Sequence, residues 1–183
     1  LVRSLCTISI WRAYEHMEAI SPLRIRMFKR NLAPVGHPVV MEEAVADKFF
    51  GDNHIAYVDS GTSALALAII DLLQEYSGDE EPYVVVPGYC CPDLISACKY
   101  AGVIPLAVDC RADAPHYELS LLNECLNDRV VAVIAVNFLG HSIDLSVYKD
   151  LISHKKLNTK IIEDNAQWFP VEKVFSSIAD YSI

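Results

Sequence analysis

The sequence lacks several patterns that mark common classes of binding protein. Its six cysteines form no CxxC pair and have no histidine at a metal-ligand spacing. This argues against a metal site and against a disulfide framework, and reduced, mostly buried thiols are the simpler expectation. Neither GxGxxG nor GxxxxGK[ST] occurs, which argues against a dinucleotide fingerprint and a Walker loop.

Positive charge and long apolar runs are also scarce. The chain has 15 Lys and Arg against 24 Asp and Glu, a net charge of −9, so it offers little to a nucleic-acid backbone. The one basic stretch, between Arg24 and Arg30, is interpreted as a solvated helix face. No apolar run reaches the eighteen or so residues of a membrane span, and the first residues do not resemble a signal peptide. These absences predict a cytoplasmic protein that binds neither nucleic acid nor membrane.

The composition that is present favours a globular α/β protein. Of the 183 residues, 52% are apolar and 21% charged, enough to bury a real core. Residues 1–53 are predicted to form an N-terminal helical segment and connector, with a helix over 41–50, and residues 54–183 an α/β domain. Strand-length apolar runs occupy 55–58, 83–86, 104–108, 130–136 and 160–162. Segments of helical periodicity between them occupy 64–73, 92–101, 119–126 and 145–154.

The apolar runs are continuous rather than alternating. This is typical of a mostly parallel sheet that helices cover on both faces. Asp144 fits the N-cap of the last helix and Gly102 the C-cap of the second. Ligands of such sheets bind outside the carboxyl ends of the strands. The segments predicted to lie there are 60–63, 87–92, 109, 137–141 and 164–167.

The segment 60–63 (SGTS) opens a helix and is a candidate anion site. Backbone N–H groups at a helix start point outward, and the helix dipole favours a negative charge. Gly61 allows close approach to the backbone, and Thr62 and Ser63 add hydroxyl donors. An ordinary helix N-cap is the alternative interpretation of the same residues.

Asp164 follows a buried strand, where a carboxylate is desolvated and needs a cationic partner. A pyridinium nitrogen fits, because an aspartate keeps the ring protonated and a protonated ring is an electron sink. Gln167, one turn later, is placed to bond a ring oxygen. A cap or a metal ligand is the alternative for an acid at a strand end. An anion site and a ring-nitrogen acid together suggest pyridoxal phosphate.

The loop 87–92 (PGYCCP) is predicted to cover one face of a planar ligand. Tyr89 is the aromatic candidate for this contact, with a loop anchor as the alternative. Cys90 and Cys91 suggest a nucleophile. No histidine stands nearby in the sequence, which disfavours a Cys/His hydrolase.

In their order and spacing these motifs resemble the DegT-type sugar aminotransferases, pyridoxal-phosphate enzymes of fold type I. The resemblance runs from about residue 55 to the end, and it is strongest at SGTSAL (60–65), VVVP (84–87), AGVIP (101–105), VD (108–109), Gly140 and EDNAQ (163–167). It implies that Gly61, Thr62 and Ser63 meet the cofactor phosphate, Asp164 the ring nitrogen and Gln167 the ring oxygen. It also implies a homodimer that uses an amino-acid donor and a keto-sugar nucleotide.

The chain departs from the family pattern at three places. Cys91 stands where the family usually has the aromatic ring that stacks on the cofactor, so the stacking contact passes to Tyr89 or is made by a weaker apolar contact. Asn137 stands where the family often has a histidine. The family's Schiff-base lysine lies beyond the segment that 179–183 resembles, and Lys173, in a polar connector, is a poor substitute.

The resemblance therefore implies the N-terminal part of a large domain, truncated before that lysine and inactive by itself. A non-catalytic truncated paralogue, serving as a binding or assembly subunit, is the alternative. A nucleotide-binding module of another family is a third reading. Transamination and the dehydration chemistry of some family relatives both remain open.

Overall fold

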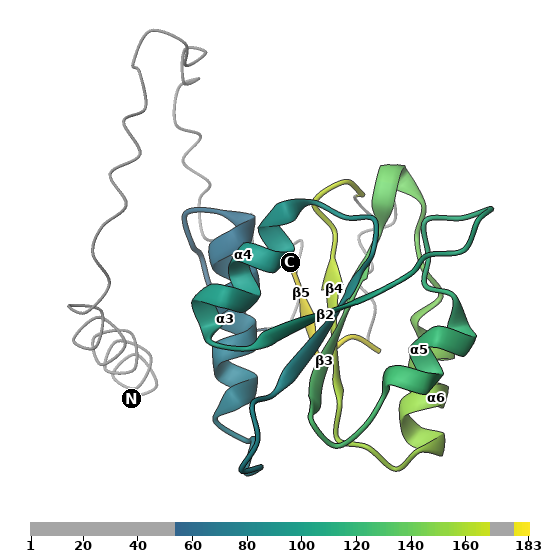
Figure 1. Ribbon diagram of the computed structural model, residues 1–183. Coiled ribbons are helices and arrows are strands. Elements are labelled where there is room, and N and C mark those ends of the chain that lie inside the picture. The colour runs from purple at the N-terminus through teal and green to yellow at the C-terminus, as the bar shows by residue number, and fades with distance from the viewer. Residues whose placement is uncertain (1–53, 169–177) are drawn as a thin grey trace, which may run out of the picture. The chain divides into compact units, whose positions relative to one another are not determined.

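A computed structural model describes residues 54–168 and 178–183 of the chain (Figure 1). The predicted segment 1–53, its helix over 41–50, and Lys173 lie outside the described residues. The helices are α3 (Gly61–Leu73), α4 (Pro92–Ala101), α5 (Leu119–Cys125) and α6 (Leu145–His154), with a 3-10 turn, η3 (Phe138–Gly140). The strands are β1 (Tyr83–Pro87), β2 (Ile104–Val108), β3 (Val130–Val136), β4 (Lys160–Asp164) and β5 (Tyr181–Ser182).

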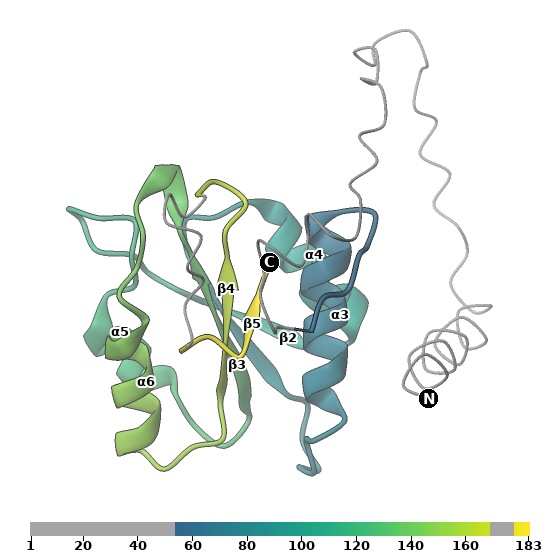
Figure 2. The same cartoon turned by 180° about the vertical axis from the view of Figure 1, so that it is seen from behind.

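The strands form one parallel sheet in the order β2-β1-β3-β4-β5. Helices α3 and α4 pack on one face of it and α5 and α6 on the other, which Figure 2 shows from behind. The predicted fold class, a parallel sheet covered on both faces, is confirmed. The chain winds outward in opposite directions from the neighbouring strands β1 and β3, so their carboxyl ends form the switch point at which such sheets bind ligands.

Continuous apolar strands build the core. All seven residues of β3 (VVAVIAV) are buried, and from Ala132 onward alternate side chains enter the two layers on either face of the sheet. Ile134 and Ile162 face α3 and α4, while Val133 and Ile161 face α5 and α6. Each such side chain contributes about 1.5–3 kcal/mol by leaving water, which is what makes the sheet a rigid base for the site.

The cap predictions hold. Asp144 accepts a hydrogen bond from the Ser146 N–H at 3.0 Å, and Gly102 ends α4 in the left-handed conformation with φ 79°. Within the described residues, no helix is both long and apolar enough to cross a membrane.

The strand predicted over 55–58 is wrong. These residues form no regular element, and Ile55, Tyr57 and Val58 are 37%, 70% and 43% exposed. An apolar run becomes a strand only when another strand satisfies its backbone groups, and no described strand pairs with this one. The fifth strand is instead β5, which adds to the edge of β4.

The expectation of mostly buried thiols is also wrong for the described cysteines. Only Cys98 is buried, because it faces the sheet from α4, whereas Cys91 is exposed and Cys90, Cys110 and Cys125 are half-buried near element ends.

Candidate active site

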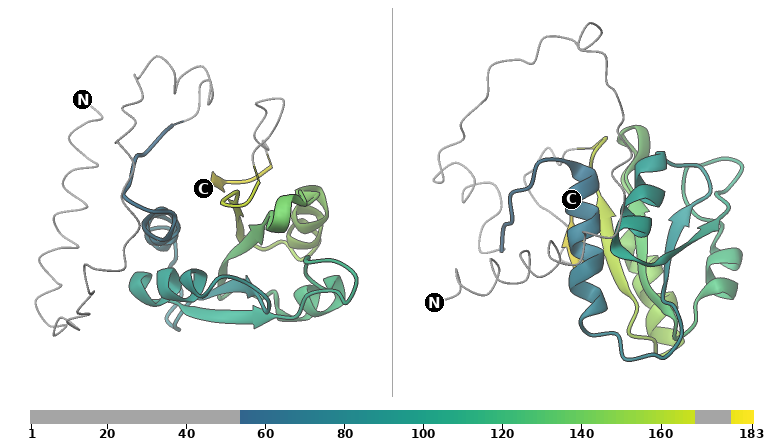
Figure 3. Two further views of the ribbon diagram at one scale, coloured as in Figure 1. Left: turned by 90° about the horizontal axis from the view of Figure 1, so that it is seen from above. Right: turned by 60° about the vertical axis from the view of Figure 1, so that its left-hand side comes forward.

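The start of α3 lies at the same edge of the sheet as the carboxyl ends of the strands. The last turn of α3, at Leu72, lines a surface hollow together with Val130 and Lys160, the first residues of β3 and β4. A helix of 13 residues is about 20 Å long, comparable to the strands it covers. The other end of α3 must therefore reach the carboxyl edge, as Figure 3 also shows. The sequence predicted that the segment 60–63 follows a strand. Because 55–58 is not a strand, the segment lies at this edge as the start of α3 and not as the end of a strand.

The first turn of α3 presents donors that no described residue pairs. The Ser60 side chain caps the helix by accepting from the Ser63 N–H at 3.1 Å, which takes that N–H out of use for a ligand. The backbone N–H groups of Gly61 and Thr62 precede the first intrahelical bond, Ala64 N to Ser60 O. Ser63 Oγ accepts from Ser60 Oγ at 3.0 Å, so its own hydroxyl hydrogen can donate elsewhere. A Cβ added at Gly61 would meet no atom within 4 Å, so this turn faces open space.

Asp164 is a buried carboxylate at the end of β4. It is 5% exposed, and its Oδ1 accepts from the Ala166 N–H at 3.0 Å. Neither oxygen has a cationic partner among the described residues, and burial raises the pKa of the carboxyl group above its ordinary value. Alternation along β4 places Asp164 on the α3 and α4 side, the side on which α3 starts. Such a group favours a cationic ligand, because a cation removes the cost of burying the charge.

Gln167 is exposed just beyond β4, and its Oε1 accepts from the Leu139 N–H at 3.0 Å. This contact ties the segment after β4 to the turn after β3. The two segments meet at the switch-point edge, as the sequence predicted for 137–141 and 164–167.

Tyr89 lies on the same edge but is not buried as a loop anchor. Its ring is 68% exposed and contacts the Phe138 ring edge-on, with centroids 5.4 Å apart. Burial raises the pKa of the neighbouring Cys90 thiol, and the nearby cysteines and the Asp164 carboxylate raise it further. This effect of Asp164 indicates that its carboxylate lies near the Cys90 thiol. Cys91 is exposed at the start of α4 without capping it. The loop 87–92 therefore brings Tyr89 against Phe138 of the turn after β3, and it brings Cys90 near Asp164.

Sequence reasoning missed the polar network beneath this edge. Asn137 is fully buried, and its Nδ2 donates to Glu163 Oε1 at 3.0 Å and to Asn165 Oδ1 at 2.6 Å. Its Oδ1 accepts from the Ile143 N–H at 2.8 Å, and Glu163 Oε2 accepts from Ser182 Oγ at 3.0 Å. An asparagine directly after a seven-residue apolar strand was the available signal, because a polar group so close to a core must be satisfied.

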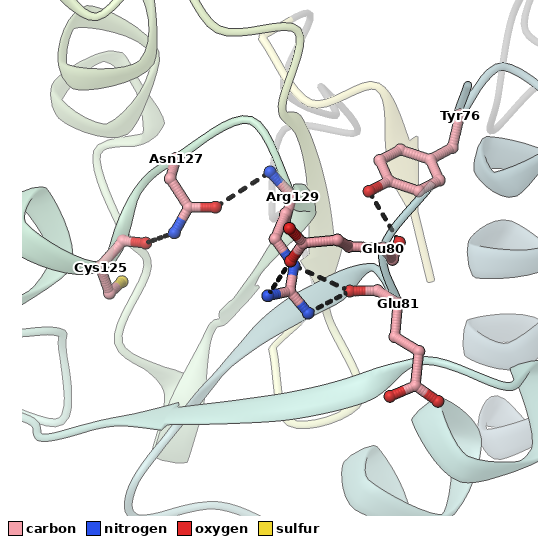
Figure 4. Close-up of polar contacts among 6 residues, drawn as sticks. All are labelled: Tyr76, Glu80, Glu81, Cys125, Asn127 and Arg129. Carbon is pink, nitrogen blue, oxygen red and sulfur yellow. Dashed lines mark hydrogen bonds and ion pairs between the residues drawn. The ribbon is translucent and has the colours of Figure 1, made fainter. Parts of the chain in front are cut away.

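The hollow at the opposite edge is structural. There the Arg129 guanidinium pairs with Glu80 at 2.6 Å and donates twice to the Glu81 carbonyl (Figure 4). It also lies 4.1 Å from the Tyr83 ring centroid. Its backbone N–H is bonded to Asn127 as well. With its charge and its donors engaged, Arg129 ties the β1 and β3 starts together and leaves no cation for a ligand.

The family assignment follows from comparison with known proteins. The pattern of the DegT/DnrJ/EryC1/StrS aminotransferase family matches residues 27–173. The chain belongs to this family. GDP-perosamine synthase of Escherichia coli O157:H7 is 32% identical over 127 residues, 67% of this chain and 33% of that protein. A dTDP-3-amino-3,4,6-trideoxy-alpha-D-glucose transaminase of Micromonospora megalomicea is 25% identical over 142 residues, 78% of this chain and 36% of that protein.

Comparison with solved structures shows the same fold. Spr1654 of Streptococcus pneumoniae, in its PMP form, superimposes with a TM-score of 0.65 at 20% identity, over 76% of this chain and 38% of that one. The present chain spans about a third of the length of the curated relatives that it matches.

The residues at the carboxyl edge fit the cofactor of this family. The open first turn of α3 suits a phosphate, and the buried Asp164, which no cation among residues 54–168 and 178–183 neutralises, suits a protonated ring nitrogen. Within 54–168 and 178–183, no group of three or more His, Cys, Asp or Glu side chains could hold a metal ion.

Proposed function

We propose that this chain forms the phosphate-binding and ring-binding part of the large domain of a pyridoxal-phosphate aminotransferase. The complete protein would move an amino group from an amino-acid donor to a keto-sugar nucleotide, working as a cytoplasmic homodimer. The observation that carries the proposal is Asp164, a buried carboxylate at the edge where α3 begins, for which the described residues supply no cation. The family membership and the nucleotide-sugar enzymes among the relatives support the substrate class.

Bound pyridoxal phosphate supplies an electron sink for the carbon that loses a proton during transfer. The chain's own residues hold it in place. Gly61 and Thr62 donate backbone N–H groups to the phosphate, with the Thr62 and Ser63 hydroxyls beside them. Asp164 keeps a proton on the ring nitrogen, because an ionised, desolvated carboxylate is stabilised by the positive charge that this proton creates.

One face of the ring is covered differently from the family pattern. Cys91 is small and exposed, so it offers little area for stacking. Tyr89, braced edge-on by Phe138, is the aromatic side chain available at this edge, and we assign the covering contact to it.

The proton carrier at the reacting carbon would be a lysine outside the described residues. The carboxyl-edge segments 60–63, 87–92, 137–141 and 164–167 contain no lysine. Lys155 donates to the Leu126 carbonyl at 3.0 Å and Lys160 lies 3.9 Å from Asp180, both away from this edge. The described residues at this edge therefore account for holding the cofactor and not for moving the proton.

A second candidate is a non-catalytic paralogue that retains the pocket as a binding or assembly subunit. The exposed Cys91 in place of a stacking ring favours it. Activity of the natural gene product decides between them: amino transfer to a keto-sugar nucleotide supports the enzyme, dehydration would reassign the reaction, and cofactor binding without either supports the subunit.

Cofactor binding itself is tested by fluorescence titration of the 183-residue chain with pyridoxamine 5′-phosphate. Asp164→Asn is expected to weaken binding by roughly tenfold or more, because it removes a charge-assisted bond to the ring nitrogen. Asp150→Asn, on the exposed surface of α6, is the matched control and should bind as the parent does. Equal affinities for the parent and Asp164→Asn would refute the assigned role.

A further inference from the structure

Two cysteines approach each other at the carboxyl edge, beside the candidate cofactor site. Cys90 lies in the loop after β1, and Cys110 follows the neighbouring strand β2. Both side chains are half-buried, and Cys90 packs against the apolar cluster under α3 and α4. The residues assigned above to the cofactor include neither thiol.

Backbone contacts hold the two segments together up to these cysteines. The strands β1 and β2 stay paired to their last residues, and beyond them the Gly88 N–H donates to the Val108 carbonyl at 2.7 Å. A Cβ added at Gly88 would lie 3.5 Å from Asp109 Cα. The two segments therefore still touch one residue before Cys110 and two residues before Cys90.

The Tyr117 hydroxyl gives a fixed reference point for both thiols. It is buried below this edge and donates to the Ile134 carbonyl at 2.6 Å. Burial raises the pKa of this hydroxyl, and Cys110 and Cys90 are among the groups that raise it further. Burial also raises the pKa of Cys90, and Cys110 is among the thiols that add to that effect. Each thiol thus lies near the other and near the same hydroxyl.

The two cysteines differ in how firmly the backbone holds them. Cys110 forms an antiparallel backbone bridge with Tyr117, a residue that is only 2% exposed. Cys90 lies instead in the stretch 88–91, which forms no helix or strand. A bond between the two sulfur atoms would therefore move Cys90 toward β2 and leave Cys110 in place.

The order of the strands determines what this movement does to the site. Strand β2 lies on one side of β1, and β3 and β4 lie on the other. Tyr89 contacts Phe138, which follows β3, and Asp164 ends β4. Drawing Cys90 toward β2 therefore pulls the adjacent Tyr89 away from Phe138 and away from the Asp164 side of the edge.

We propose that Cys90 and Cys110 form a redox-sensitive disulfide that withdraws the loop 87–92 from the cofactor site. The oxidant is hydrogen peroxide: one thiolate attacks it, the O–O bond breaks, and a sulfenic acid and water result. The second thiolate attacks the oxidised sulfur, the S–S bond forms and a second water leaves. Two thiols and one peroxide thus give one disulfide and two waters, and the sulfurs lose the two electrons that the peroxide gains. Thiol reductants reverse the reaction, so the bond acts as a switch.

Peptide mapping tests the bond directly. The 183-residue chain is treated with hydrogen peroxide, its remaining thiols are alkylated, and it is digested with trypsin without reduction. Trypsin cuts after lysine and arginine, so Cys90 falls in fragment 49–99 and Cys110 in fragment 100–111. Mass spectrometry should show these two fragments joined, and a reductant should separate them.

Serine variants assign the pair, because fragment 49–99 contains two further cysteines. Cys90→Ser and Cys110→Ser should each abolish the joined species, since each removes one of the two sulfurs. Cys91→Ser should retain it, and so should the control Cys125→Ser at the end of α5. The proposal is overturned by a joined species that persists in Cys90→Ser. It is also overturned if none forms at a peroxide dose that oxidises the exposed Cys91.

Fluorescence titration with pyridoxamine 5′-phosphate tests the withdrawal of the loop, which rests on the proposed function. The reduced parent is expected to bind roughly twofold to tenfold more tightly than the oxidised parent, the range of one lost aromatic contact. The difference should be absent in Cys110→Ser, which controls for oxidation elsewhere.

The two proposals fail in different ways. If the reduced parent does not bind the ligand, the proposed function is wrong and the withdrawal falls with it, while the peptide map still decides whether the bond forms. If the bond forms and the parent binds equally in both states, the proposed function stands and the withdrawal is refuted.

Discussion

The Tyr181 hydroxyl donates to Asp71 Oδ2 at 2.6 Å across 110 positions of sequence. Tyr181 belongs to the two-residue edge strand β5, and Asp71 lies in the last turns of α3. The bond therefore connects the helix whose first turn is the candidate phosphate site to the strand that completes the sheet beside Asp164. A strand of two residues has few bonds of its own, so this contact matters for its place in the fold.

Removing the hydroxyl should loosen this edge. Tyr181→Phe is expected to lower the free energy of unfolding by about 1 kcal/mol, since the bond is charge-assisted but partly solvated. Urea denaturation measures it, with Tyr57→Phe as the control at a tyrosine that is 70% exposed.

The same bond predicts a pH dependence. Burial first, and then the Asp71 carboxylate, raise the pKa of Tyr181 above its usual value of 10. The folded state therefore holds the proton more tightly than the unfolded chain, so this contribution is complete below pH 10 and is lost as the pH rises beyond it. Tyr181→Phe should show a shallower loss of stability in that range, and an identical slope in the two proteins would contradict the assignment.

Asp164→Asn should stabilise the protein while weakening cofactor binding. Burial raises the pKa of the Asp164 carboxyl group in the folded protein above its value of 3.8 in the unfolded chain. The protonated group's contribution to stability is therefore complete below pH 3.8 and is lost as the pH rises through the pKa of the folded state. At pH 7 the unpaired charge is a cost that asparagine removes, while its side-chain oxygen can still accept from Ala166. We expect a gain of about 1 kcal/mol in urea denaturation at pH 7. A loss of stability would mean that the carboxylate already has a strong partner in the free protein.

The buried network predicts unequal effects for its two central residues. Asn137→Ala leaves the Ile143 N–H and Glu163 without their partner, which should cost about 3 kcal/mol. Glu163→Gln keeps an oxygen for Asn137 and gives Ser182 a donor to accept from, so the cost should stay below about 1 kcal/mol. Chemical denaturation of both variants checks the order, and equal losses would show that the charge of Glu163 matters more than its bonds.

The ends of α4 and α6 have the same hydrogen-bond pattern, so they allow the cost of left-handed backbone strain to be compared. In α4, Gly102 N bonds Lys99 O and Val103 N bonds Cys98 O, and in α6, Lys156 and Leu157 make the same two bonds. The left-handed residue is Gly102 in the first and Lys156, with φ 56°, in the second. Lys156→Gly should therefore stabilise by about 0.5–1 kcal/mol, and Gly102→Ala should destabilise by a similar amount. Thermal melts of the two variants should shift in opposite directions.

Much of the fold could be predicted from the sequence, because it depends on local patterns. The continuous apolar runs of β1, β3 and β4 are buried on both faces, which is typical of a parallel sheet with covering helices, whereas the equally apolar β2 is a partly exposed edge strand. Asp144 and Gly102 mark helix ends through bonds within a few residues of each other. The order of the short motifs pointed to the aminotransferase family, which the comparisons confirm.

The sequence-based predictions were wrong where the formation of a strand depends on residues distant in sequence. The run 55–58 has the composition of a strand but no described partner, whereas Tyr181 and Ser182 become a strand because β4 leaves an edge open to them. The roles assigned to Gly61, Thr62, Ser63, Tyr89, Cys91, Asp164 and Gln167 remain predictions.

The sequence by itself determined which residue types stand at the start of α3 and after β4, since chain order places a serine and a glycine at the first and an aspartate and a glutamine at the second. Tertiary structure alone decided what each can do. Packing of β4 between its neighbours buries the Asp164 carboxylate where no described residue offers it a cation, and the Leu139 N–H determines which end of the Gln167 amide is bonded. Desolvation and hydrogen-bond direction are set by atoms that meet only when the chain is folded.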